Sequence, residues 1–179
     1  MKSRRITLLA AIAPLLLIGL QAAPAAASKT RTPTASRAEV TFVNPEKFTD
    51  AADGERGSDW GRDGNLEALK EHIERRASVY IPEGQKLKVK ITDVDLAGEI
   101  EPWRSPNFRD VRIVKDIYFP RIELTFQLVD ATGAVIKEGT RRLSDMAFLT
   151  TIHLDRSDPL VYDKGLLDDW MRSEFAAKK

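Results

Sequence analysis

The run Arg121-Ile122-Glu123-Leu124-Thr125-Phe126-Gln127-Leu128 decides the fold, because apolar and polar side chains alternate along its whole length. Alternation with a period of two places the apolar side chains on one face of a β-strand and the polar ones on the other. Residues 130–133 form a turn sequence that ends in glycine, which readily adopts the left-handed backbone of tight turns. Residues 134–143 can then return as the antiparallel partner. The sequence therefore predicts a β-hairpin that is buried on one face.

Two further strands are predicted before this hairpin. Residues 86–91 alternate lysine with a large aliphatic residue, which is typical of a strand with one wet face. Val94 and Leu96 continue the apolar pattern out of phase, so a β-bulge near residues 92–93 is expected to restore it. Residues 39–43 also alternate, and the Asn-Pro pair that follows them indicates the end of a strand and a turn.

Helical periodicity marks two segments. The first begins at Asn65 and ends before Pro82, and the Asp-rich and Gly-rich residues 49–64 before it are interpreted as a loop. The second lies near the C-terminus, where Asp158-Pro159 can precede or cap it. The predicted apolar faces are Leu66, Leu69, Ile73 and Ala77 in the first helix, and Leu166, Leu167, Trp170, Met171 and Phe175 in the second.

The order of these elements is strand, helix, strand, long loop at residues 98–112, hairpin and helix. Mostly antiparallel strands with helices gathered on one side form a two-layer sandwich. We therefore expect an α+β fold with a three- to four-stranded, mostly antiparallel sheet and two helices on one face. We assign residues 39–176 to a single domain, because a chain of 179 residues supports one ordinary hydrophobic core.

The N-terminal residues 1–27 have the three parts of an export signal. Basic residues come first, a short apolar run follows, and small alanines precede a cleavage point near Ser28. The apolar run is shorter than the roughly 20 residues that span a bilayer, so no stable membrane anchor is expected after cleavage. We expect export by the general secretory route to the periplasm or the medium, with residues 28–38 as a flexible linker.

Composition narrows the classes of partner and site. The export signal holds three of the 28 Lys and Arg residues and none of the 27 Asp and Glu residues, so the remaining chain is slightly acidic. This balance argues against nucleic acid or anionic lipid as the partner. The chain has no cysteine, which excludes disulfides, a thiol nucleophile and thiolate ligands to a metal.

The two histidines do not indicate a metal site. His72 lies off the apolar face of its helix and is predicted to be exposed, while His153 is far away in sequence without an HExxH pattern. The serines lack a GxSxG setting, and no glycine-rich loop precedes a helix. We therefore predict no catalytic constellation, no metal and no cofactor.

Four residues are candidates for binding: Asp95, Glu99, Trp103 and Arg104. Trp103 either packs beneath its loop against the core, which is the favoured interpretation, or acts with Arg104 as a recognition anchor. Asp95, Glu99 and Glu101 are close in sequence, and paired carboxylates can carry out glycoside hydrolysis. The sequence does not state the distances between them.

Several runs resemble the exported bacterial proteins catalogued as domain of unknown function 3016. The resemblance implies an exported bacterial protein and assigns no activity or site residue. The matching runs are Val40 to Asp50, Asp93 to Glu99, Asp110 to Ile113, Pro120 to Leu124, Ser157 to Leu160 and Leu166 to Trp170.

Two functions compete at this point. The leading interpretation is a non-catalytic periplasmic binding or accessory module that meets another envelope protein. The alternative is a small carboxylate-dependent hydrolase that acts on envelope polysaccharide. The sequence names neither the partner nor the oligomeric state.

Overall fold

The computed structural model describes residues 36–52, 59–101, 103, 111–151 and 157–176. The predicted export signal, Arg104 and His153 lie outside the described residues. Export and cleavage therefore stay predictions.

The sheet has four strands in the order β1-β2-β5-β6. These strands are β1 (Ala38–Phe42), β2 (Lys86–Asp95), β5 (Arg121–Val129) and β6 (Val135–Ser144). The pairs β2–β5 and β5–β6 are antiparallel, whereas β1 runs parallel to β2. A parallel pair needs a long crossover connection, and the first helix supplies it. The predicted mostly antiparallel sheet is confirmed.

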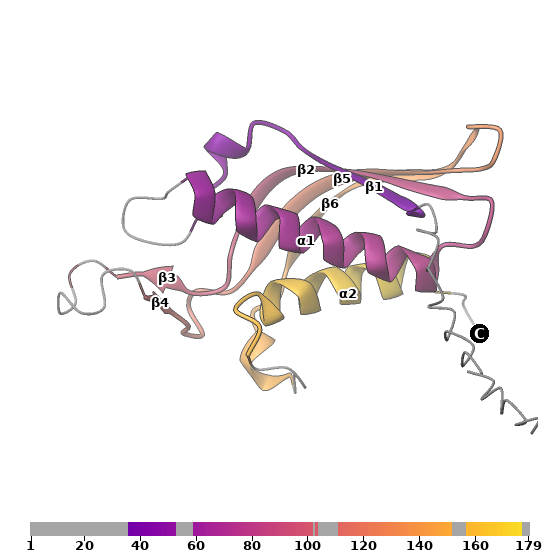
Figure 1. Ribbon diagram of the computed structural model, residues 1–179. Coiled ribbons are helices and arrows are strands. Elements are labelled where there is room, and N and C mark those ends of the chain that lie inside the picture. Colours follow the sequence, from indigo (N-terminus) through magenta and orange to yellow (C-terminus); the bar gives the residue numbers. More distant parts are fainter. Residues whose placement is uncertain (1–35, 53–58, 102, 104–110, 152–156, 177–179) are drawn as a thin grey trace, which may run out of the picture. The chain divides into compact units, whose positions relative to one another are not determined.

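Two helices, α1 (Asp59–Tyr80) and α2 (Val161–Phe175), cover the same face of this sheet (Figure 1). Together they form the predicted α+β two-layer sandwich. No described helix is long and apolar enough to cross a membrane.

The start of α1 corrects the predicted loop, because residues 59–64 are helical. Two polar contacts hold this first part: Arg62 pairs with Asp59 at 3.0 Å, and the Asn65 amide donates to the Ala51 carbonyl at 3.2 Å. The local ion pair and the contact with Ala51 offset the low helix propensity of the two glycines in the segment.

The core lies between the sheet and the helices and contains the predicted apolar stripes. Phe126 of β5 makes edge-to-face contacts with Trp170 and Phe175 of α2, at centroid distances of 5.8 and 5.5 Å. Gly139 on β6 makes room for the Phe126 ring, because a Cβ there would lie 3.2 Å from it. The prediction of Trp170 as a core residue is confirmed.

Both predicted backbone irregularities are present. The register of β2 against β5 shifts between Ile91 and Asp93, which is the expected bulge. Gly133 has a φ of 87°, and the Asp130 carboxylate accepts backbone N–H groups from Thr132 and Ala134 across the turn.

Residues 98–112 contain more order than a loop. The strands β3 (Glu99–Ile100) and β4 (Arg112–Ile113) pair as a small antiparallel sheet. Two short 3-10 helices complete the described elements, η1 (Pro45–Lys47) and η3 (Phe148–Thr150).

His72 is not the exposed residue that the sequence predicted. Its Nε2 lies 2.9 Å from a carboxylate oxygen of Asp168 on α2, and the same oxygen accepts from Arg76 Nε at 2.7 Å. The contact arises because α1 and α2 pack side by side. Burial lowers the pKa of His72, against the opposing effect of the Asp168 charge.

Candidate functional site

The chemically distinctive end of the molecule is where β2 ends, α2 begins and the small β3–β4 sheet lies (Figure 1). Two features meet there, a set of buried or half-buried carboxylates and a pocket with exposed apolar side chains in its wall. They come from segments far apart in the sequence.

Asp163 is the most deeply buried of the described carboxylates, with 1% of its surface exposed. It lies in the first turn of α2 and accepts the Ala97 N–H at 3.0 Å through Oδ1. Its other oxygen has no hydrogen-bond partner among the described residues. Burial raises the pKa of Asp163 to about 7, although the Ala97 amide and the Arg112 charge oppose this rise. The carboxyl group therefore ionises near neutral pH.

Arg112 of β4 ties three segments together near Asp163. Its guanidinium binds both carboxylate oxygens of Asp50, at 2.6 and 3.0 Å. It also donates to the carbonyls of Gly98 and Ala52, at 2.9 and 2.7 Å. Gly98 has a φ of 89°, and a Cβ at this position would lie 2.9 Å from Arg112 Cγ. A glycine is therefore needed both for the backbone and for the passage of the arginine.

Asp95 lies at the end of β2 and is bound by the guanidinium of Arg121. The Arg121 Nε donates to Asp95 Oδ2 at 2.8 Å. Burial raises the pKa of Asp95, and the nearby charges of Asp50 and Asp93 add to this rise. Arg121 opposes both effects.

The other two carboxylates of the predicted group bind elsewhere. Glu101 is 2% exposed and accepts from the Tyr118 hydroxyl at 3.0 Å and from the Lys115 ammonium. Glu99 belongs to β3 and is half-buried. Within the described part of the chain, Asp95 and Glu101 bind different partners, so the structure does not unite the predicted group in one contact network.

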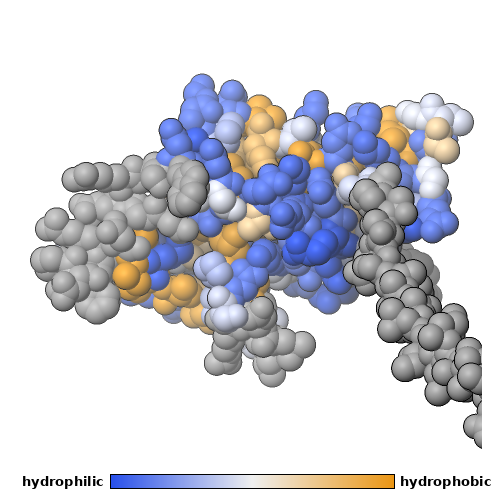
Figure 2. All heavy atoms as spheres, in the orientation of Figure 1, coloured by the Kyte–Doolittle hydropathy of each residue, from blue (hydrophilic) through white to orange (hydrophobic). Residues whose placement is uncertain are grey.

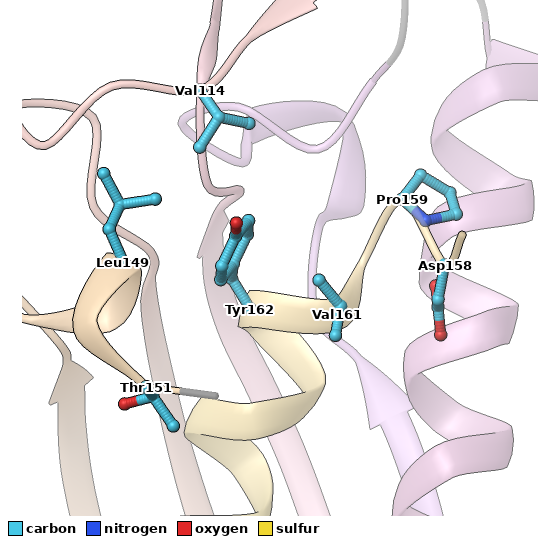
Figure 3. A pocket seen from close by; sticks show the side chains of 7 residues that line it. All are labelled: Val114, Leu149, Thr151, Asp158, Pro159, Val161 and Tyr162. Atoms are coloured by element: carbon cyan, nitrogen blue, oxygen red, sulfur yellow. The ribbon is translucent and has the colours of Figure 1, made fainter. Parts of the chain in front are cut away.

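The pocket has a volume of about 490 Å³, lies between β4, η3 and the start of α2, and is lined by both apolar side chains and the polar side chains of Thr151 and Asp158. Val114, Leu149 and Tyr162 face one another across it, and Val161 and Pro159 continue the wall (Figure 3). The Tyr162 ring is held from behind by Phe148, edge to face at a centroid distance of 4.9 Å. This volume falls in the range of natural ligand pockets, roughly 300 to 1,000 Å³.

Two residues that line the pocket, Val114 and Leu149, and two that lie three residues before and after Val114 in the chain have exposed apolar side chains. The exposed fractions are 65% for Ile117, 45% for Leu149, 44% for Val111 and 41% for Val114. Figure 2 shows apolar residues gathered at this end, while the outer surface of the helices is mainly hydrophilic. We call Val111, Val114, Ile117 and Leu149 the apolar end surface.

Trp103 is 73% exposed, so the favoured interpretation that it packs against the core is wrong. It lies three residues after the end of β3. Sequence periodicity alone could not show this exposure. The alternative interpretation as a recognition anchor is consistent with this exposure.

Asp163 and the pocket residues were missed at the sequence level, although one signal was present. Asp163 stands three and four residues before Leu166 and Leu167, which places its carboxylate on the apolar stripe of the helix. A charged group on such a stripe indicates a buried acid. The pocket had no local signal, because its walls come from three separate segments.

The buried carboxylates and the exposed apolar side chains of this end differ in their access to solvent. The two most buried carboxylates are closed off from a large substrate, whereas the apolar side chains are open to solvent. No group of three or more His, Asp or Glu residues could hold a metal ion within the described part of the chain.

Comparison with known proteins identifies the family of the chain. Residues 36–173 match the family model described as protein of unknown function, DUF3016. No curated protein and no solved structure gives a significant match. The matched region covers most of the chain and includes all the runs that carried the resemblance in the sequence. The chain therefore belongs to the DUF3016 family.

Proposed function

We propose that this protein is an exported, non-catalytic binding or accessory module of the bacterial envelope, and that its partner is another protein. The observation that carries the proposal is the apolar end surface around a pocket of about 490 Å³. Exposed apolar side chains gathered around a pocket mark interaction sites in soluble proteins. The export signal predicted at residues 1–27 supports an envelope location.

A protein partner suits this surface better than a small polar ligand. The pocket combines four aliphatic residues and the Tyr162 ring with the polar side chains of Thr151 and Asp158, and Trp103 is exposed after β3. Protein interfaces use such anchors, surrounded by a polar rim. The rim is supplied by Asp158, whose carboxylate binds the Lys164 ammonium at 2.6 Å.

Site-specific photocrosslinking in intact cells tests the proposal. A photoreactive residue at Val114 or Leu149 is expected to capture one reproducible envelope protein, and the purified pair should then bind in solution. A photoreactive residue at Arg75, on the exposed surface of α1, serves as the control. Equal capture from Arg75, or no binding by the purified pair, would contradict the proposal.

Removing two exposed anchors should weaken the complex without loss of fold. We expect Trp103→Ala with Ile117→Ser to lower the affinity for the captured partner at least about tenfold, because exposed aromatic and aliphatic anchors dominate interfaces. The free energy of unfolding should change by no more than about 0.5 kcal/mol per site, as is usual for surface positions. Titration calorimetry and urea unfolding measure the two quantities. Unfolding of the variant would instead assign these side chains to stability.

One observation favours the hydrolase alternative, the raised pKa of Asp95. A general acid at neutral pH needs such a shift. If the protein cleaves envelope polysaccharide, Asp95→Asn should lower the release of reducing ends from purified wall material, while Asp169→Asn on the exposed side of α2 should not. An inactive wild-type protein would dispose of this alternative.

A further inference from the structure

The sheet face that the helices leave uncovered carries a second candidate site, which is polar where the apolar end surface is not. It is a hollow of about 550 Å³ over the middle of β2, β5 and β6. Apart from Phe126, whose ring packs on the opposite face against α2, its side chains are polar or absent.

The register arranges these side chains in two rows across the strands. One row is Thr41, Lys90, Thr125 and Thr140, and the other is Glu39, Lys88, Gln127 and Glu138. Neighbouring strands lie about 4.8 Å apart, and residues two apart on a strand about 7 Å. The two rows therefore form a compact grid of hydrogen-bonding groups.

The carboxylates of the grid already have partners at its edges. Glu39 pairs with Lys86 at 2.8 Å, and Glu138 accepts from the Gln127 amide at 2.9 Å. Within the described part of the chain, Lys88 and Lys90 make no ion pair. The Thr125 and Thr140 hydroxyls likewise have no hydrogen bond there. The centre of the grid consequently presents two ammonium groups and two hydroxyls, which we call the donor centre.

We propose that the donor centre binds an anionic oligosaccharide, with the lysines on its acidic groups and the threonines on its hydroxyls. Charge complementarity carries the choice of an anion, since the two lysines at the centre make no ion pair within the described residues, while Glu39 is paired with Lys86 and Glu138 lies at the β6 edge of the grid. None of the described residues that line the hollow is an exposed aromatic or large aliphatic side chain of the kind that forms the hot spots of protein interfaces. The proposal is independent of the apolar end surface, so either can fail alone.

Binding of a matched pair of sugars tests the inference. A phosphorylated maltooctaose should bind at least roughly tenfold more tightly than the unmodified sugar, and added salt should reduce the difference. Equal binding of the two sugars would overturn the role of charge. Equally tight binding of an octaglutamate peptide or of phosphatidylglycerol vesicles would overturn the role of the sugar.

Substitutions then locate the site. Lys88→Gln with Lys90→Gln should lower the affinity for phosphorylated maltooctaose at least roughly tenfold, because charge-assisted hydrogen bonds are lost. Thr125→Val with Thr140→Val keeps β-branched residues and should weaken binding by roughly fivefold. The control, Lys47→Gln with Lys70→Gln, makes the same charge change away from this face. A similar loss in the control would overturn the assignment, and unchanged thermal unfolding would confirm that each variant is folded.

Discussion

The free energy of unfolding is expected to fall by up to about 4 kcal/mol through Asp163 as the pH rises from about 4 to about 7. The physical reason is burial: the folded protein holds a proton on this carboxyl that the unfolded chain has already lost. With a pKa of 3.8 when exposed and about 7 in the fold, Asp163 stabilises the fold fully below the lower value. That stability is lost as the pH rises through the upper value.

The magnitude follows from linkage. The two pKa values differ by about three units, and each unit corresponds to about 1.4 kcal/mol between the protonation states. The groups that face Asp163 set where it ionises: the Arg112 charge and the Ala97 amide favour the carboxylate, and the Asp50 charge disfavours it. The unpartnered oxygen makes the ionised form costly in this place.

Other titratable groups also change the free energy of unfolding in this pH range, and their contributions must be separated from that of Asp163. The pKa of His72 is lowered in the fold, so its contribution increases as the pH rises through its usual value of 6.5. The raised pKa of Asp95 acts in the same direction as that of Asp163. Both effects cancel when the wild type is compared at each pH with a variant that differs only at residue 163.

Asp163→Asn is that variant. The amide keeps an oxygen that can accept the Ala97 N–H and cannot ionise, so the difference in unfolding free energy between variant and wild type should change between about pH 4 and about pH 7 and level off above that. Urea unfolding at several pH values measures it. Asp169→Asn, on the exposed side of the same helix, should run parallel to the wild type. Parallel curves for Asp163→Asn as well would show that Asp163 ionises normally.

The periodicity of the sequence was sufficient to predict the strands and the core residues, because both follow patterns that repeat over a few neighbouring residues. The alternation in β5 predicted the buried face around Phe126, and the phase change after Ile91 predicted the bulge. A strand's partners are not encoded locally, so the parallel pairing of β1 with β2 could not be predicted. His72 was assigned to the surface for the same reason, since its partner Asp168 lies on the other helix.

The candidate site was less predictable than the fold. Asp95 and Trp103 were candidates from the sequence, but the Arg121 partner of Asp95 and the exposure of Trp103 had no local signal. Arg112 carries no local signal, because its acceptors lie at Asp50, Ala52 and Gly98. Contacts over such sequence distances exist only after folding has brought the segments together.

Arg112→Met should be the most damaging single substitution at this end of the molecule, with a loss of about 3 to 5 kcal/mol in unfolding free energy. Methionine retains much of the side-chain length but removes every hydrogen bond of the guanidinium. Asp50, whose side chain is 19% exposed, would be left half-buried without its cation, and two backbone carbonyls would lose a donor.

A matched control separates this effect from the loss of a charge. Arg142→Met breaks the ion pair with Glu123 on the open sheet face, where the arginine side chain is 82% exposed, so it should cost less than about 1 kcal/mol. Asp50→Asn in the Arg112→Met background should recover part of the loss, since the uncompensated charge is then removed. Equal losses for Arg112→Met and Arg142→Met would show that the Asp50 contact does not hold the β4 segment to the domain.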